Sequence, residues 1–193
     1  MNVRQFLFQN RSYTPIPFLV VMVIFARPTI VSLCVGFCIV AAGECLRLWG
    51  VAIAGSETRT TGPVGGTFLI TRGPFAYVRN PLYVGNIIMY TGVGVMSLAL
   101  FPWLTLAAFC YFLWQYAQIV TLEEEHLASA FGEEYRKYSQ AVPRFLPTSE
   151  RYHGGNNPQP ELEWRKGLKS ETRTLQAIGL LAATLAVLWW LRG

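Results

Sequence analysis

The sequence predicts an all-α fold, an integral membrane bundle of about five transmembrane helices. Hydrophobic residues make up 52% of the 193 residues and charged residues 14%, whereas about a quarter of a soluble domain is charged. Residues 80–122 contain no charged side chain at all. Several apolar stretches approach the roughly 20 residues that cross a bilayer as one helix. Together these observations favour a membrane protein over a soluble domain.

The predicted spans differ in how closely they fit this length. Three are long and uncharged: residues 82–98, 101–122 and 175–191. Residues 29–54 are long enough but carry Glu44 and Arg47. Residues 16–26 are short and have prolines on both sides, so this first segment is expected to be tilted or re-entrant.

Basic residues are distributed unequally between the two sides of these five spans. One side would hold the N-terminus and residues 55–81 and 122–173, which contain thirteen of the sixteen Lys and Arg residues. Since cytoplasmic loops carry an excess of Lys and Arg, we expect the N-terminus and the main polar segments to be cytoplasmic. The net charge of +5 then reflects topology and contact with anionic lipids, and nucleic acid is not expected as a partner.

The sequence "RGPFAYVRNPLYVG" leads into the uncharged run. Pro81 suits the first position of a helix, which places Arg79 and Asn80 at that helix's N-terminus. Unpaired N–H groups and the helix dipole favour an anion there. Alternatively, Arg79 reaches lipid phosphates and Tyr77 and Tyr83 belong to an interfacial aromatic belt.

Residues 121–147 begin with a capping-box pattern from Thr121 to Glu124, which predicts a helix start. Apolar residues then recur with helical spacing: Leu127, Phe131, Tyr135, Tyr138 and Val142. Glu123 and Glu124 precede Leu127 by four and three residues, so they share its predicted buried face. Carboxylates that point inward at a membrane surface need a cationic partner.

Glu44 and Arg47 stand three residues apart and therefore share one helix face. An ion pair within one helix is the simplest explanation. Ionisable residues inside a membrane span are also functional candidates, because exposing them to lipid is costly. The two interpretations are compatible, and the spacing alone leaves both open.

The four cysteines all fall in apolar stretches and form no CxxC pair. We expect them to be small buried hydrophobic residues. Only His126 and His153 could supply imidazole ligands, so no metal site is expected.

Several of these segments together resemble the isoprenylcysteine carboxyl methyltransferase family, which is related to the phosphatidylethanolamine methyltransferases. The resemblance rests on "GECLR" with "AGS", then "RGPFAYVRNPLYVG", "EEE", "FGEEYRKY" and "VPRFLP", in that order. It defines a core at residues 43–147 within one predicted domain, residues 1–193. A linker and a further helix, residues 148–193, lie outside it.

The resemblance implies methyl transfer from S-adenosylmethionine, with the cofactor entering from the cytoplasmic face and a prenylated or other lipophilic acceptor entering from the bilayer. The family builds part of its cofactor site from an Arg-His-Pro-x-Tyr turn and a later Glu pair. The corresponding residues here are Arg79, Asn80, Pro81, Tyr83, Glu123 and Glu124. Asn80 replaces the family's His, which puts any hydrogen bond that needs an imidazole in doubt.

Such a transfer is an in-line displacement at an activated methyl group, which needs proximity and exclusion of water rather than a metal. Arg47 and Arg144 are the candidates for orienting a carboxylate acceptor. An ammonium acceptor would first have to lose a proton, and Glu44 is the candidate base for it. The acceptor class therefore decides which of these residues is needed.

Three other functions fit parts of the pattern. A phospholipid amine is an alternative acceptor for the same bilayer-open architecture. An NADPH-dependent sterol-type reductase has a similar Arg-x-Pro-x-Tyr-x-Gly turn, but the "GECLR" block and the "EEE" to "FGEEY" spacing argue against it. A non-enzymatic membrane scaffold would use the Glu and Arg residues only as structural pairs.

Overall fold

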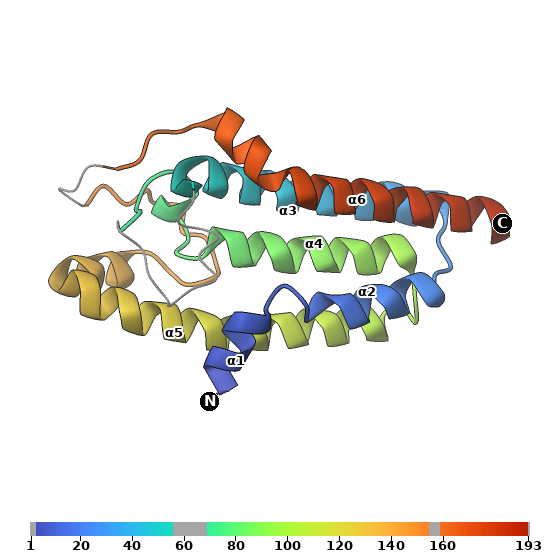
Figure 1. The fold of residues 1–193 in the computed structure, drawn as a ribbon, viewed down its shortest axis with the longest axis horizontal. Helices are drawn as coiled ribbons and strands as arrows, with labels where there is room; N and C mark the ends of the chain where they lie inside the picture. The colour runs from blue at the N-terminus through green and yellow to red at the C-terminus, as the bar shows by residue number, and fades with distance from the viewer. Residues whose placement is uncertain (1–2, 56–68, 155–158, 193) are drawn as a thin grey trace.

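The computed structural model describes residues 3–55, 69–154 and 159–192, and these residues form helices without any strand (Figure 1). The predicted all-α class is therefore confirmed. Within the described residues, six α-helices and one 3₁₀ turn follow one another: α1 (Val3–Asn10), α2 (Pro15–Ile24), α3 (Ile30–Ala54), η2 (Gly73–Ala76), α4 (Pro81–Ser97), α5 (Trp103–Ala141) and α6 (Trp164–Arg192).

Three of the described helices, α3, α5 and α6, are long and apolar enough to cross a membrane. Helix α4 has 17 residues, which is at the lower limit of roughly 17 to 25 residues for a span. Helix α2 has 10 residues and extends only about 15 Å at 1.5 Å per residue. The protein is thus a helical membrane bundle, but the first of the five predicted spans is too short to cross the hydrocarbon core by itself.

Helix α4 runs through the middle of the bundle, with α3 and α6 on one side of it and α2 and α5 on the other (Figure 1). Glycines bring α3 and α4 close together, because a Cβ atom added to Gly43 would lie 2.7 Å from the Gly85 carbonyl oxygen. The converse distance, from a Cβ on Gly85 to the Gly43 oxygen, is also 2.7 Å. Small residues at helix contacts are the usual means of close packing in membranes.

The end of α3, the starts of α4 and α6, and the second half of α5 gather at one end of the bundle (Figure 1). Two predictions for α5 are wrong there. Thr121 does not cap a helix start, since it lies inside α5 and its hydroxyl donates to the Ala117 carbonyl at 2.9 Å. The helix is also broken at Gly132, whose φ of 52° and ψ of −119° are not helical.

The break at Gly132 does not prevent the predicted apolar stripe from packing as one buried face. Its residues pack into one cluster with Leu69 and Tyr152 on both sides of the break: Leu127, Phe131, Tyr135, Tyr138 and Val142. Glycine tolerates the positive φ that such a turn requires. The second half of α5 therefore folds against the segments that precede α4.

The expectation that the cysteines are buried is wrong. Cys34, Cys38, Cys45 and Cys110 are all exposed on the surface of the bundle. The outward face of a membrane helix meets lipid, so an apolar residue on such a helix has no need of a buried position. Apolar composition alone therefore does not distinguish core from surface here.

Candidate active site

The turn before α4 is held in place by the second half of α5. Its 3₁₀ segment begins at Gly73, with a φ of 61°, and Pro81 opens α4 with Asn80 as the residue before it. The Tyr138 hydroxyl donates to the Phe75 carbonyl at 2.7 Å. The backbone N–H of Arg79 donates to the Pro143 carbonyl at 2.9 Å. The predicted helix start at Pro81 is thus confirmed, and its position depends on contacts more than sixty residues away in sequence.

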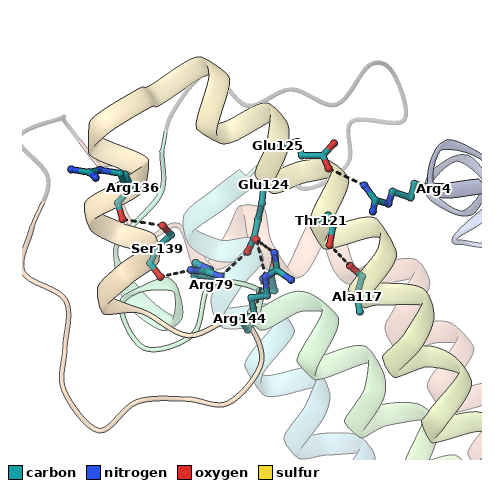
Figure 2. A network of polar contacts seen from close by, with 10 residues as sticks. Arg4, Arg79, Ala117, Thr121, Glu124, Glu125, Arg136, Ser139 and Arg144 are labelled. Carbon is teal, nitrogen blue, oxygen red and sulfur yellow. Dashed lines mark hydrogen bonds and ion pairs between the residues drawn. The ribbon is translucent and has the colours of Figure 1, made fainter. Parts of the chain in front are cut away.

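Glu124 lies between two arginines in Figure 2. Its Oε1 is 3.0 Å from Arg79 Nη2, and its Oε2 accepts from Arg144 Nε at 2.8 Å. Arg79 also donates to the Ser139 carbonyl. We call Arg79, Glu124 and Arg144 the outer cluster. Its formal charge is +1, and its members range from 11% exposed at Arg79 to 44% at Arg144.

The other predicted cofactor residues lie close to the outer cluster. The Tyr83 hydroxyl donates a hydrogen bond to Glu123 Oε1 at 2.6 Å. The Asn80 side-chain amide donates to the Arg144 carbonyl at 3.1 Å. Pro81 is buried at the first turn of α4. The structure thus brings all six predicted cofactor residues to one end of the bundle.

Tyr135 lies in the second half of α5, close to Glu124, and its environment shifts the pKa of its phenol. Burial and then the nearby Glu124 carboxylate raise the pKa of the Tyr135 phenol above its usual value. Loss of the phenolic proton would place a second negative charge next to Glu124 in a poorly hydrated site. Tyr135 therefore remains a neutral hydroxyl that can donate a hydrogen bond.

A second charged group lies deeper in the bundle. Arg47 Nε donates to Glu44 Oε2 at 3.3 Å, and Arg47 Nη2 donates to Glu171 Oε2 at 2.8 Å. Its Nη1 donates to the side-chain oxygen of Asn86, whose amide donates to the Tyr116 hydroxyl at 3.2 Å. We call Glu44, Arg47 and Glu171 the inner cluster. Its formal charge is −1 when both carboxylates are ionised.

One cavity of about 1220 Å³ connects the two clusters. Arg79, Glu124, Arg47 and Glu171 all line it, whereas Glu44 and Arg144 are not among its lining residues. Its walls continue into apolar side chains of α2, α4 and α6. A cavity with charged groups of both signs and an apolar extension suits an amphiphilic ligand beside a charged one.

Aromatic rings form one wall of this cavity. Tyr83 stacks on Tyr116 with ring centroids 4.7 Å apart, and Tyr90 stacks on Phe112 at 4.3 Å. The three tyrosines line the cavity. Ring faces attract cations, so this wall favours a positively charged group or an apolar one over an anion.

Glu171, Asn86 and Tyr116 also belong to the site, although they were not among the residues predicted from the sequence. Glu171 lies in the region that the sequence assigns to a linker and a further helix, four residues after Gly167 and four residues before the predicted apolar run that begins at residue 175. Asn86 is a polar residue inside an uncharged run, a pattern that identifies functional candidates in membranes. No local pattern links Tyr116 to Asn86, 30 residues earlier.

The fold and the site define a class: a helical membrane protein with a large cavity that joins a charged cluster at one end of the bundle to a second one deeper inside. Within that class the chain belongs to the phospholipid methyltransferase family, whose sequence model matches residues 31–134, more than half of the chain. The predicted resemblance to this family is thereby confirmed.

Named relatives agree with this family. The chain is 38% identical over 80 residues to protein-S-isoprenylcysteine O-methyltransferase of Schizosaccharomyces pombe, covering 41% of this chain and 33% of the relative. It is 34% identical over 124 residues to the human protein of the same name, covering 58% and 40%. It is also 36% identical over 111 residues to the cobalt-zinc-cadmium resistance protein CzcN of Cupriavidus metallidurans, covering 56% and 45%. The chain spans less than half the length of each of these relatives.

Proposed function

We propose that this protein is an S-adenosylmethionine-dependent methyltransferase that acts on a lipophilic acceptor, most like the carboxyl O-methylation of a prenylated cysteine. The observation that carries the proposal is the single cavity that joins the outer cluster to the inner cluster and to apolar walls. It offers separate places for a charged cofactor and for an acceptor with an apolar chain. The names of the relatives support the reaction class.

The residues of the outer cluster fit the cofactor. An amino-acid carboxylate would meet Arg79 and the N-terminus of α4, where dipole and donors favour an anion. An ammonium would meet Glu123 or Glu124. Arg79 Nε is buried and, among the described residues, has no hydrogen-bond partner, so it retains a donor for a ligand. We assign cofactor contacts to Arg79, Asn80, Pro81, Tyr83, Glu123 and Glu124 as part of this proposal.

When bound, S-adenosylmethionine supplies a methyl group on a positively charged sulfur. The protein's own task is to orient the acceptor and exclude water. Arg47 lines the cavity and can hold a carboxylate, which needs no general base. Arg144 forms an ion pair with Glu124 and is not among the residues that line the cavity. We therefore assign it to the cofactor end of the site and no longer to the acceptor.

A phospholipid amine is the second candidate acceptor. The inner cluster favours it, because two carboxylates surround one guanidinium and Glu44 Oε1 is buried without a hydrogen bond among the described residues. A carboxylate there would attract an ammonium and accept its proton. Glu171 lines the cavity and Glu44 does not, so Glu171 reaches such an acceptor more directly.

We further propose that the end of the bundle with the outer cluster faces the cytoplasm. Most basic residues lie in segments that the predicted topology places on that side. A soluble cofactor would then enter from the cytoplasm and the acceptor from the bilayer. Labelling of an engineered cysteine at residue 150 in sealed vesicles, from one side at a time, tests the orientation.

Binding of S-adenosylmethionine to the detergent-purified protein, measured by calorimetry, tests the proposal. We expect binding that weakens about tenfold or more in Glu124→Gln, since a charge-assisted contact is lost. Glu125→Gln is the matched control, because Glu125 is exposed and pairs with Arg4 at 2.8 Å. Binding of NADPH instead would replace this function with a reductase, and binding of neither would favour the scaffold.

A further inference from the structure

Helix α6 lies outside residues 31–134, yet it supplies two charged residues to the cavity lining, Glu171 and Arg173. Only Gly167, Glu171 and Leu185 are buried among its described residues. They are separated by 4 and 14 residues, so they fall on one helix face at 3.6 residues per turn. A helix that buries so little therefore directs a carboxylate toward the bundle interior.

Gly167 explains how the start of α6 approaches α3. A Cβ on Gly167 would lie 3.0 Å from both the Cα and the Cβ of Ala52. The Glu163 backbone N–H also donates to the Ala52 carbonyl at 2.8 Å. These contacts fix the first turn of α6 against α3, one turn away from Glu171.

Neutralisation of Arg47 does not by itself account for Glu171. Glu44 lies on the same helix as Arg47 and already supplies a carboxylate at 3.3 Å. Addition of Glu171, whose side chain is 2% exposed, places a second carboxylate in a poorly hydrated site, and such burial is costly. The added contact therefore needs an explanation other than charge balance, and restraint of the Arg47 guanidinium supplies one.

Among the described residues, Arg47 has hydrogen-bond partners on three helices. Nε meets Glu44 on α3, Nη1 meets Asn86 on α4 and Nη2 meets Glu171 on α6. Because the guanidinium is planar and its donors point in fixed directions, three separated acceptors determine its plane. Arg47 is thereby held at the cavity wall, with 13% of its side chain exposed.

We propose that Glu171 is a positioning residue for the acceptor site: it holds the Arg47 guanidinium in the orientation in which it meets the acceptor's carboxylate. This inference rests on the proposed function and deepens it, because it makes α6 part of the acceptor site. Glu171 acts through Arg47, and the outer cluster does not depend on it.

The test compares the binding of two probes, N-acetyl-S-farnesylcysteine and its carboxamide, to detergent-purified protein. Arg47 favours the charged probe over the neutral one. The dissociation constant of the carboxamide divided by that of the carboxylate probe therefore reports the orientation of Arg47. We expect Glu171→Gln to reduce this ratio about tenfold, as loss of one charged hydrogen bond predicts. The dissociation constant of S-adenosylmethionine should stay unchanged.

Glu163→Gln is the matched control, since Glu163 is an exposed carboxylate next to α6 that pairs with Lys166. In an Arg47→Lys background, Glu171→Gln should change the ratio less than twofold, because lysine lacks the planar fork that Glu171 orients. In the single variant Glu171→Gln, methyl transfer to the farnesylated carboxylate probe should show a raised KM with little change in kcat.

An unchanged probe ratio in Glu171→Gln, with S-adenosylmethionine bound normally, would overturn the positioning role and leave the proposed function standing. A wild-type protein that binds neither S-adenosylmethionine nor the probes would overturn both. If Glu171→Gln does not fold, Glu171→Asp replaces it, since it retains the charge and withdraws the carboxylate by one methylene. A reduced ratio in that variant supports the role, and an unchanged ratio rejects it.

Discussion

The two charged clusters have opposite compositions and opposite environments. The outer cluster joins two arginines to one glutamate at the end of the bundle, where Arg144 is 44% exposed. The inner cluster joins two glutamates to one arginine, and no member's side chain is more than 13% exposed. Water and salt can screen the first but scarcely the second. The same types of ion pair should therefore contribute differently to stability at the two places.

The difference also separates what each cluster can do. A surplus of positive charge beside the N-terminus of α4 favours an anion from the aqueous side. A surplus of negative charge inside the bundle is costly unless each group is held by several partners. The inner cluster is therefore expected to be rigid, whereas Arg144 can move when a ligand arrives.

The largest effect should come from Arg47→Ala. It leaves two buried carboxylates facing each other without their cation, and breaking a buried pair in this way costs about 3–5 kcal/mol. Thermal unfolding in detergent, followed by circular dichroism, measures the loss. Addition of Glu171→Gln to this variant should restore part of the stability, because one of the unpaired charges is removed. No change on Arg47→Ala would mean that the inner cluster is hydrated.

Gly85→Ala should have an intermediate effect that is confined to the inner cluster. A Cβ there would lie 2.5 Å from Arg47 Cγ and 2.7 Å from the Gly43 carbonyl oxygen. Such overpacking costs about 1–3 kcal/mol and displaces Arg47. We expect a lower unfolding temperature and weaker acceptor binding, with S-adenosylmethionine binding retained.

Gly179→Ala is the matched control for that substitution. A Cβ at Gly179 meets nothing within 4 Å, and alanine is the better helix former. Its unfolding temperature should equal or exceed that of the wild type. Equal losses in both glycine variants would show that the close approach of α3 and α4 is not what Gly85 provides.

The sequence revealed the two clusters to different extents. Arg79 and Glu124 belong to short motifs with interpretable local chemistry, so their placement at one end of the bundle could be anticipated from a helix start and an apolar stripe. Glu171 and Arg47 are 124 residues apart. No periodicity or cap connects them, and only the packing of α6 on α3 brings them together.

Boundaries within α5 were also beyond the reach of local rules. Thr121 and Glu124 match a capping box, but the apolar run before them continues the helix, so the pattern has no free N–H groups to cap. Gly132 lies inside a regular helical spacing, which does not reveal the break, and the residues on both sides of it pack into one cluster around Tyr138. The single-domain assignment and the roles of the site residues remain predictions.

The smallest effect should come from Arg144→Ala. Its pair with Glu124 is partly exposed, and such pairs contribute about 1 kcal/mol or less. Arg79 continues to hold Glu124 at 3.0 Å, so no buried charge loses its last partner. We expect the unfolding temperature to fall slightly at low ionic strength and to match the wild type at high salt, whereas the loss in Arg47→Ala should persist at both. A salt-independent loss in Arg144→Ala would show that the outer cluster is as shielded from water as the inner one, and the contrast between them would then reduce to the sign of their charge.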